Sequence, residues 1–267
     1  MKLGVIGTGN MATAIIEGVL KKHFLDTNDL YCYNIFPNEA TKFASKFNIN
    51  KCETNEELVE KSNYILLAVK PHHIPGVLEQ IKPYLSNKKI IISIAAGVNI
   101  KDIEEILNDA LPIVRVMPNI NAIVQEGAAG ICFNKFVNNT QEKFVLDLFN
   151  SIGKTYKIDE KDFPTYSAIA GCSPAFTYLF IDSMARAAVK NGLNKEVAVA
   201  IVAQAVLGSA KMLVENEESP FNLIDKVCSP GGTTIEGVYS LERNAFMGII
   251  MDAIQASIDK DYKLQKK

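Results

Sequence analysis

A glycine-glycine-threonine-threonine turn near the carboxyl end of the chain has the composition of an anion-binding site. Gly231 and Gly232 precede Thr233 and Thr234, where a helical pattern begins. Consecutive glycines let several backbone N–H groups converge, and the N-terminus of a helix adds a partial positive charge. A small carboxylate or a phosphate fits such a turn. The alternative is a plain helix boundary in which Thr233 acts only as the N-cap.

A second glycine-rich turn lies near the start of the chain, directly after a short apolar run. Gly7 and Gly9 are followed by Ala12 in the spacing Gly-x-Gly-x-x-Ala. The first glycine allows a tight turn, the second lets the backbone approach a pyrophosphate, and the alanine lets a helix pack closely on a strand. Because the turn joins a predicted strand to a predicted helix, it predicts a dinucleotide-binding site.

The end of the second predicted strand bears on the choice between NADH and NADPH. An acidic residue at this place binds the ribose hydroxyls of NADH and repels the 2'-phosphate of NADPH. The chain has Asn34 there instead, followed by Ile35 and Phe36, and no arginine that would bind the phosphate. We therefore expect NADPH to be the preferred cofactor, with NADH as the alternative.

The composition is that of a globular enzyme. Of the 267 residues, 48% are hydrophobic and the formal net charge is −2, so the chain can bury a large core and has no basic surface for nucleic acid or anionic lipid. Five cysteines without a Cys-x-x-Cys pair and three histidines without metal-ligand spacing indicate neither disulfides nor a metal site. Because the apolar run after Lys2 passes at once into the glycine turn, we expect no signal peptide and a cytoplasmic protein.

The pattern of apolar residues divides the chain near residue 162. Before it, short apolar runs alternate with helical spacing, which predicts an α/β domain with a Rossmann-type, doubly wound parallel sheet over residues 1–161. Residues 162–267 carry only helical patterns and predict an all-α domain. The expected strands are 2–6, 30–34, 64–69, 89–94, 113–117 and 129–133, and the expected helices are 11–22, 38–47, 74–85, 100–107, 168–190, 195–214 and 235–259.

Residues 197–214 form an almost uniformly apolar helical segment. Its length, and the polar side chains of Gln204 and Lys211 within it, argue against a membrane span. A helix that is apolar on all sides has too little of its own chain to pack against in so small a domain. We therefore expect it to be buried between the subunits of a homo-oligomer.

The motifs and their order resemble those of the pyrroline-5-carboxylate reductase family over nearly the whole chain. The resemblance implies reduction of 1-pyrroline-5-carboxylate to L-proline by NAD(P)H, the last step of proline biosynthesis. It also implies a homodimer formed through the helical domain, with a decamer as a further assembly. The chain departs from the family at Asn121, where a proline is usual, and at residues 34–36, where many members have Asn-Arg-Ser. The matching segments are Gly-Thr-Gly-Asn-Met-Ala (7–12), Val-Lys-Pro (69–71), Arg-Val-Met-Pro-Asn (115–119), Gly-Cys-Ser-Pro-Ala-Phe (171–176) and Ser-Pro-Gly-Gly-Thr-Thr-Ile (229–235).

This reaction assigns roles to the two turns. We expect N–H groups of the second turn to bind the substrate carboxylate, and Thr234 to be the catalytic residue, whose hydroxyl aligns the ring nitrogen or relays a proton to it. Helix capping is the alternative role of Thr234. The expected substrate-binding residues are Ser229, Gly231, Gly232, Thr233 and Thr234; the expected cofactor-binding residues are Gly7, Thr8, Gly9, Asn10, Met11, Asn34, Asn55, Ala68, Val69, Lys70, Pro71, Met117 and Asn119, of which Asn55 is placed near the adenosine ribose by the resemblance.

Gly171 and Pro174 predict a kink in the first helix of the second domain, and its freed backbone groups would either face the site or serve only the fold. Two other functions stay open. A dehydrogenase of the 6-phosphogluconate or β-hydroxy-acid type would use a lysine of the second domain, but Lys190, Lys195 and Lys211 do not stand in its signature. A non-catalytic, dinucleotide-binding regulator would not need the intact segment 229–235.

Overall fold

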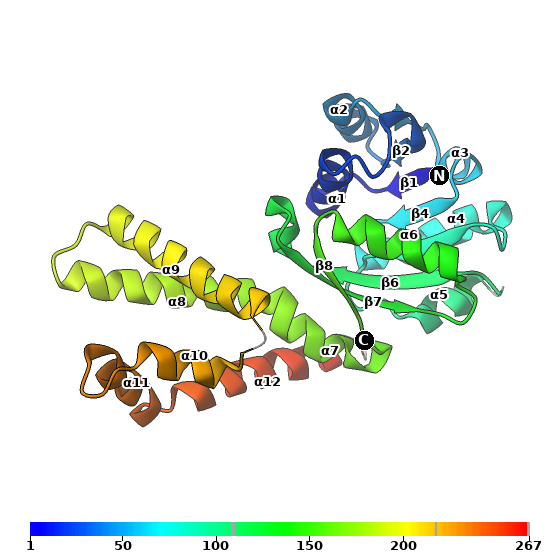
Figure 1. Ribbon diagram of the computed structural model, residues 1–267. Coiled ribbons are helices and arrows are strands. Elements are labelled where there is room, and N and C mark those ends of the chain that lie inside the picture. The colour runs from blue at the N-terminus through cyan, green and yellow to red at the C-terminus, as the bar shows by residue number, and fades with distance from the viewer. Residues whose placement is uncertain (108–109, 217, 266–267) are drawn as a thin grey trace. The chain divides into compact units, whose positions relative to one another are not determined.

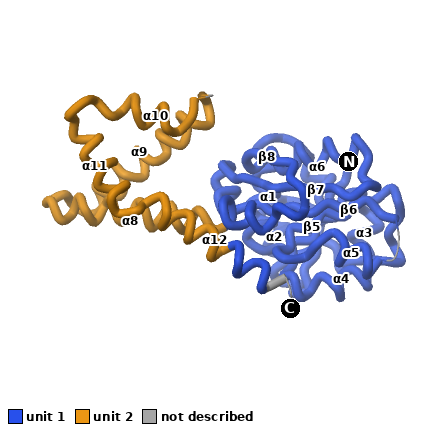
Figure 2. Tube along the Cα trace, turned by 90° about the horizontal axis from the view of Figure 1, so that it is seen from below, with its two compact units in different colours: residues 1–171, 258–267 blue, residues 172–257 orange. Residues whose placement is uncertain are grey.

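The computed structural model describes residues 1–107, 110–216 and 218–265. The chain divides into two compact units, which we call the sheet unit (Met1–Gly171 with Ile258–Lys267) and the helical unit (Cys172–Ser257) (Figure 2). The domain boundary predicted at residue 161 stays a prediction. Residues after it that carry the helical pattern, Phe163 and Tyr166 among them, are buried within the sheet unit.

The described part of the sheet unit contains an eight-stranded sheet in the order β3-β2-β1-β4-β5-β6-β7-β8. Strands β1 to β6 are parallel, whereas β7 is antiparallel to β6 and parallel to β8. The predicted α/β fold with a Rossmann-like sheet is confirmed. The strands are β1 (Leu3–Ile6), β2 (Leu30–Tyr33), β3 (Asn50–Lys51), β4 (Tyr64–Leu67), β5 (Ile90–Ser93), β6 (Ile113–Pro118), β7 (Gly127–Phe133) and β8 (Gly153–Lys157).

Helices cover both faces of this sheet (Figure 1). Successive side chains of a strand point to opposite faces, so Leu66 packs into one apolar cluster while Ile65 and Leu67 pack into the other. Each fully buried side chain of this size contributes about 1.5–3 kcal/mol. The first cluster lies under α1 (Asn10–Lys21), α2 (Pro37–Phe47) and α6 (Asn139–Asn150), and the second under α3 (Asn55–Lys61), α4 (Ile74–Ile81) and α5 (Ile100–Leu107).

The direction of β7 differs from the all-parallel sheet that the sequence pattern predicts. Only the short 3-10 segment η4 (Ile120–Val124) lies between the end of β6 and the start of β7. A parallel connection needs about a dozen residues or more, whereas an antiparallel partner can follow a short turn. The sequence pattern also misses β3, β8, α3 and α6. Strand β8 is polar and partly exposed, which hides it from a search for apolar runs.

The helical unit contains α8 (Ser173–Lys190), α9 (Lys195–Glu215), α10 (Pro220–Val227), α11 (Thr233–Arg243) and most of α12 (Phe246–Gln265). The prediction of a single helix over 235–259 is wrong, because two helices, α11 and α12, cover this segment and the helical structure is interrupted between them. Ala245 has a φ of 57°, a left-handed conformation that ends a helix. Neither glycine nor proline marks this break in the sequence, and α10 is likewise not predicted.

Much of the apolar surface of the helical unit is exposed. Ala185, Ala198 and Val202 are buried, but Ile201 is 56% and Leu207 is 57% exposed on α9. Within the described residues, α9 is the one helix that is long and apolar enough, by length and composition, to cross a membrane. Exposed apolar area of this extent marks a surface that another molecule covers.

Three of the five cysteines are buried in the sheet unit. Burial raises the pKa of the Cys32 and Cys132 thiols to about 12 and that of Cys52 to about 11. Because the thiolate is the nucleophile, we expect these three thiols to resist iodoacetamide in the native protein and to react after unfolding in guanidinium. Mass spectrometry of the two samples measures the modification of each cysteine. Rapid modification of Cys132 in the folded protein would contradict the expectation.

Candidate active site

A cavity of about 590 Å³ lies at the carboxyl ends of β1, β2 and β4. In the sheet, β1 stands between β2 and β4, so the strand order reverses at this point. Doubly wound sheets bind their ligands where this reversal occurs. The residues that line the cavity are Ile6, Gly7, Thr8, Gly9, Tyr33, Asn34, Ile35, Phe36, Asn55, Ala68, Val69, Lys70, His72, His73, Gly76, Val77 and Gln80.

The two glycines of the first turn meet different surroundings. Gly7 has a φ of 97°, and a Cβ on it would lie 2.7 Å from the carbonyl oxygen of Ala68. A Cβ on Gly9 would meet nothing within 4 Å. Gly9 is also the N-cap of α1, and no side chain caps this helix terminus. This arrangement fits a pyrophosphate held at a helix N-terminus.

Asn34 connects the end of β2 to the glycine turn. Its Nδ2 donates to Thr8 Oγ1 at 2.7 Å, and its Oδ1 accepts from the backbone N–H of Phe36 at 3.0 Å. Both ends of the amide are therefore used within the protein. Ile35 and Phe36, which follow it, are largely exposed.

Asn55 places an unpaired acceptor in the wall of the cavity. The residue is 5% exposed, and its Nδ2 donates to Gln80 Oε1 at 2.7 Å. Its Oδ1 has no hydrogen-bond partner among the described residues. An unsatisfied buried acceptor costs about 1–3 kcal/mol, and a ligand hydroxyl such as one of a ribose could satisfy this atom only if the Asn55 side chain turned toward the cavity.

The predicted cofactor residues are only partly brought together. Asn10, Met11 and Pro71 adjoin residues of the cavity in the chain but are not among its lining residues, and Met117 and Asn119 lie at the end of β6 outside it. His72 and His73, which the sequence does not assign to the cofactor site, do line it, and His73 is the N-cap of α4. Their position just after a strand end of the switch region is the signal that was available.

In the helical unit, the second glycine turn has the geometry of a binding loop. The N–H of Gly232 donates to the carbonyl oxygen of Ser229 at 3.0 Å, and Gly231 has a φ of 66°. With Pro230 before it, this is the pattern of a type II turn. A Cβ on Gly232 would lie 2.5 Å from Ser229 Oγ and 3.1 Å from the Ser229 carbonyl oxygen, so any other residue there would have to displace the Ser229 side chain.

Helix α11 begins directly after this turn. Its N-cap is Gly232, and no side chain caps it, so neither Thr233 nor Thr234 is the N-cap. The interpretation of these threonines as ordinary caps is wrong. The N–H groups of the first turn are left for an external acceptor, and the exposed Thr234 lies in the same turn.

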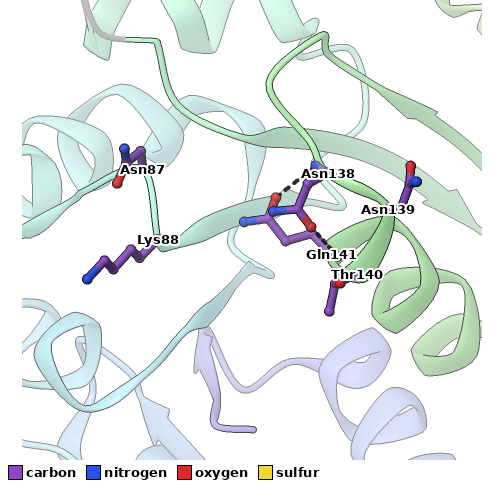
Figure 3. Close-up of a pocket in the computed structure, with 6 residues that line it drawn as sticks. All are labelled: Asn87, Lys88, Asn138, Asn139, Thr140 and Gln141. Carbon is purple, nitrogen blue, oxygen red and sulfur yellow. Dashed lines mark hydrogen bonds between the residues drawn. The ribbon is translucent and has the colours of Figure 1, made fainter.

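A different hollow, of about 840 Å³, lies near the start of β5 and the N-terminus of α6 (Figure 3). Here the Asn138 side chain accepts from the Gln141 backbone, and the Gln141 side chain accepts from the Asn138 backbone, both at 3.0 Å. This reciprocal capping box satisfies the helix N-terminus internally. The helix N-terminus at this hollow therefore offers no free N–H groups of the kind left uncapped at the start of α1.

Family comparisons agree with this geometry. Residues 160–264 match the model described as pyrroline-5-carboxylate reductase dimerisation, and residues 2–97 match that of NADP oxidoreductase, coenzyme F420-dependent. The pyrroline-5-carboxylate reductase of Escherichia coli (strain K12) is 36% identical over 265 residues, which cover 99% of this chain and 98% of the relative. The chain belongs to the pyrroline-5-carboxylate reductase family. The reductase of Aquifex aeolicus is 38% identical, over 99% of this chain and 97% of its own length.

Solved structures of pyrroline-5-carboxylate reductases share the fold along almost the whole chain. The Plasmodium falciparum enzyme with NADP bound has a TM-score of 0.87 and 40% identity, and covers 99% of this chain and 98% of its own. The Coxiella burnetii enzyme has a TM-score of 0.94 and 32% identity, with 98% of both chains covered. Two of the three lysines of this chain that were considered for the alternative dehydrogenase class form ion pairs: Lys195 with Asp182, and Lys211 with Glu215. Family membership therefore favours the imine-reductase assignment over that class.

Proposed function

We propose that this protein reduces 1-pyrroline-5-carboxylate to L-proline with NAD(P)H in proline biosynthesis. The observation that carries the proposal is the start of α11, where Gly232 is the N-cap and no side chain satisfies the first N–H groups. The turn around Ser229, Gly231 and Gly232 would bind a small carboxylate there. Full-length relatives named pyrroline-5-carboxylate reductase support the assignment.

The chemistry asks the protein to orient a ring rather than to supply a nucleophile. When bound, the reduced nicotinamide supplies a hydride to the imine carbon, and the ring nitrogen gains one proton. In the substrate one carbon separates the carboxylate from this nitrogen. A carboxylate held by N–H groups of the first turn of α11 therefore brings the nitrogen near the Thr234 hydroxyl, which donates a hydrogen bond to it or relays a proton from solvent.

The test follows nicotinamide absorbance in mixtures of the purified protein with pyrroline-5-carboxylate and either NADPH or NADH. We expect nucleotide oxidation together with the appearance of proline. Nucleotide binding without oxidation would indicate the non-catalytic regulator instead. Failure to bind either nucleotide would contradict the assignment of the cavity at β1, β2 and β4.

The charge of the cavity wall supports NADPH as the preferred cofactor. Among the described residues that line it, Lys70, His72 and His73 are basic and none is acidic. We expect kcat/KM to be about tenfold or more higher with NADPH than with NADH, and Asn34→Asp to reduce this ratio by repelling the 2'-phosphate. Paired kinetics with both nucleotides measure it, with the KM for pyrroline-5-carboxylate as the control. If kcat/KM were the same with NADPH as with NADH, in wild type and in Asn34→Asp alike, the preference for NADPH would be refuted.

We also propose that a second copy of the chain covers the exposed apolar side chains of the helical unit. They lie in the segment that matches the dimerisation model. Burial of this surface in a homodimer removes apolar area from water. Sedimentation velocity distinguishes the dimer from a monomer and from a larger assembly such as the decamer.

The cytoplasmic location of the protein stays a prediction.

A further inference from the structure

Two histidines stand in the wall of the cavity at the carboxyl ends of β1, β2 and β4. His72 and His73 both line it, and both are exposed. Their rings lie against each other, with the centroids 4.1 Å apart and the ring planes at 51°. Within the described parts of the chain, neither side chain has a hydrogen bond or an ion pair. Two imidazoles are therefore held at the cavity wall without contributing such a bond to the fold.

Helix α4 turns one of its faces toward this cavity. Residues 73, 76, 77 and 80 all line it, which is the i, i+3, i+4, i+7 spacing of a single helical face. His73 is the N-cap of the helix, where the helix dipole places a partial positive charge. A Cβ on Gly76 would meet nothing within 4 Å, so the glycine leaves space on the same face as His73. A negatively charged group fits this place.

The amide side chains that line the cavity are engaged with other residues of its wall. The Asn34 Nδ2 donates to Thr8 Oγ1 at 2.7 Å, and the Asn55 Nδ2 donates to Gln80 Oε1 at 2.7 Å. No arginine or acidic residue occurs among the described residues of the lining. The charged partners that the cavity offers to an anion beyond the glycine turn are therefore its basic side chains.

We propose that His72 and His73, together with Lys70, bind the 2'-phosphate of NADPH and give the protein its cofactor selectivity. The inference rests on the proposed function, in which NADPH is the preferred cofactor. An imidazole donates one hydrogen bond when neutral and two when protonated, and the protonated ring adds a positive charge. Hydrogen bonds between charged groups are about twice as strong as those between neutral groups. NADH carries a hydroxyl in place of this phosphate and gains much less from the same side chains.

The primary test is the double variant His72→Phe with His73→Phe, which keeps two aromatic rings and removes their N–H groups. We expect the dissociation constant of NADPH, measured by calorimetry, to rise about tenfold or more, and that of NADH to stay within about twofold. Because the two nucleotides differ only in the 2'-phosphate, the ratio of their dissociation constants isolates its contribution.

Three results of this titration would overturn the proposal. An equal loss of affinity for both nucleotides would place the histidines against a part that the nucleotides share, such as the adenine ring. Unchanged binding of both would leave the histidines without a role in the site. A wild-type protein that binds NADPH no more tightly than NADH would refute the preference and, with it, this explanation of the preference.

His23 provides the matched control. It follows the carboxyl end of α1, at the other end of that helix from the glycine turn, and lines a different hollow. Its φ of 52° is a conformation that asparagine adopts readily, so His23→Asn should leave both dissociation constants unchanged. If the phenylalanine variant does not fold, His72→Ala with His73→Ala replaces it, and should likewise weaken the binding of NADPH more than that of NADH.

Adenosine 2',5'-bisphosphate separates this inference from the proposed reaction. It carries the 2'-phosphate without a nicotinamide, so its binding depends on neither hydride transfer nor substrate. We expect it to displace NADPH from the wild-type protein at about tenfold lower concentration than 5'-AMP, and to lose this advantage in the phenylalanine variant. An advantage that survives in the variant would refute the role of the histidines. Absence of pyrroline-5-carboxylate reduction by the wild-type protein would refute the proposed function and leave these binding results standing.

Discussion

Replacing Thr234 by alanine should lower kcat for pyrroline-5-carboxylate reduction about a hundredfold, the scale of a lost proton-transfer or orienting group. The reason is its place in the first turn of α11, beside N–H groups that no side chain caps. Because Thr234 is not the N-cap, loss of its hydroxyl should change the melting temperature little. Steady-state kinetics and thermal unfolding of the two proteins measure both effects.

Thr234→Ser is the matched control for this prediction. It keeps the hydroxyl and removes only a methyl group, so we expect kcat within about fivefold of wild type. A solvent deuterium isotope effect that is present in wild type and absent in Thr234→Ala would indicate a proton relayed through the hydroxyl. Near-normal turnover of Thr234→Ala would contradict the proposed catalytic role of the Thr234 hydroxyl.

Gly9→Ala should weaken nucleotide binding by about tenfold or more without destabilising the fold. The added Cβ meets no protein atom within 4 Å and projects from the N-cap of α1 into the space expected for the pyrophosphate. The φ of Gly9 is −78°, which alanine adopts without strain. Calorimetric titration with NADPH and urea unfolding test the two halves of the prediction.

Gly7→Ala provides the contrast within the same turn. Its φ of 97° and the contact at 2.7 Å with the Ala68 carbonyl oxygen place the cost in the fold itself. We expect a loss of about 1–3 kcal/mol in the free energy of unfolding. If Gly9→Ala were as destabilising as Gly7→Ala, or bound NADPH normally, the division of labour between the two glycines would be wrong.

The sequence predicts those parts of the molecule whose causes are local. The glycine turns follow from steric demands at single residues, and the alternation of short strands with helices follows from apolar periodicity. The antiparallel direction of β7 depends on the length of a connection, and the break at Ala245 carries no glycine or proline signal. Neither the direction of β7 nor the break at Ala245 can be predicted from the periodicity of apolar residues.

The candidate site could be predicted from the sequence to about the same extent as the fold. Residues that line the cavity through their backbone, such as Gly7 and Val69, follow from a motif, whereas His72 and His73 line it because of the helical segment after β4. The hydrogen bond from Asn119 to the Ala170 carbonyl could not be predicted, because the two residues are 51 positions apart in the sequence. Long-range pairings of this kind require the fold.

Helix α12 begins in the helical unit, but its residues from Ile258 onward belong to the sheet unit. In terms of chain connectivity, the helical unit is thus an insertion that leaves the sheet unit after Gly171 and re-enters it before Ile258. The sheet unit is therefore complete only when two segments that are far apart in the sequence have come together. During synthesis it acquires the segment from Ile258 onward only after the whole helical unit has been made.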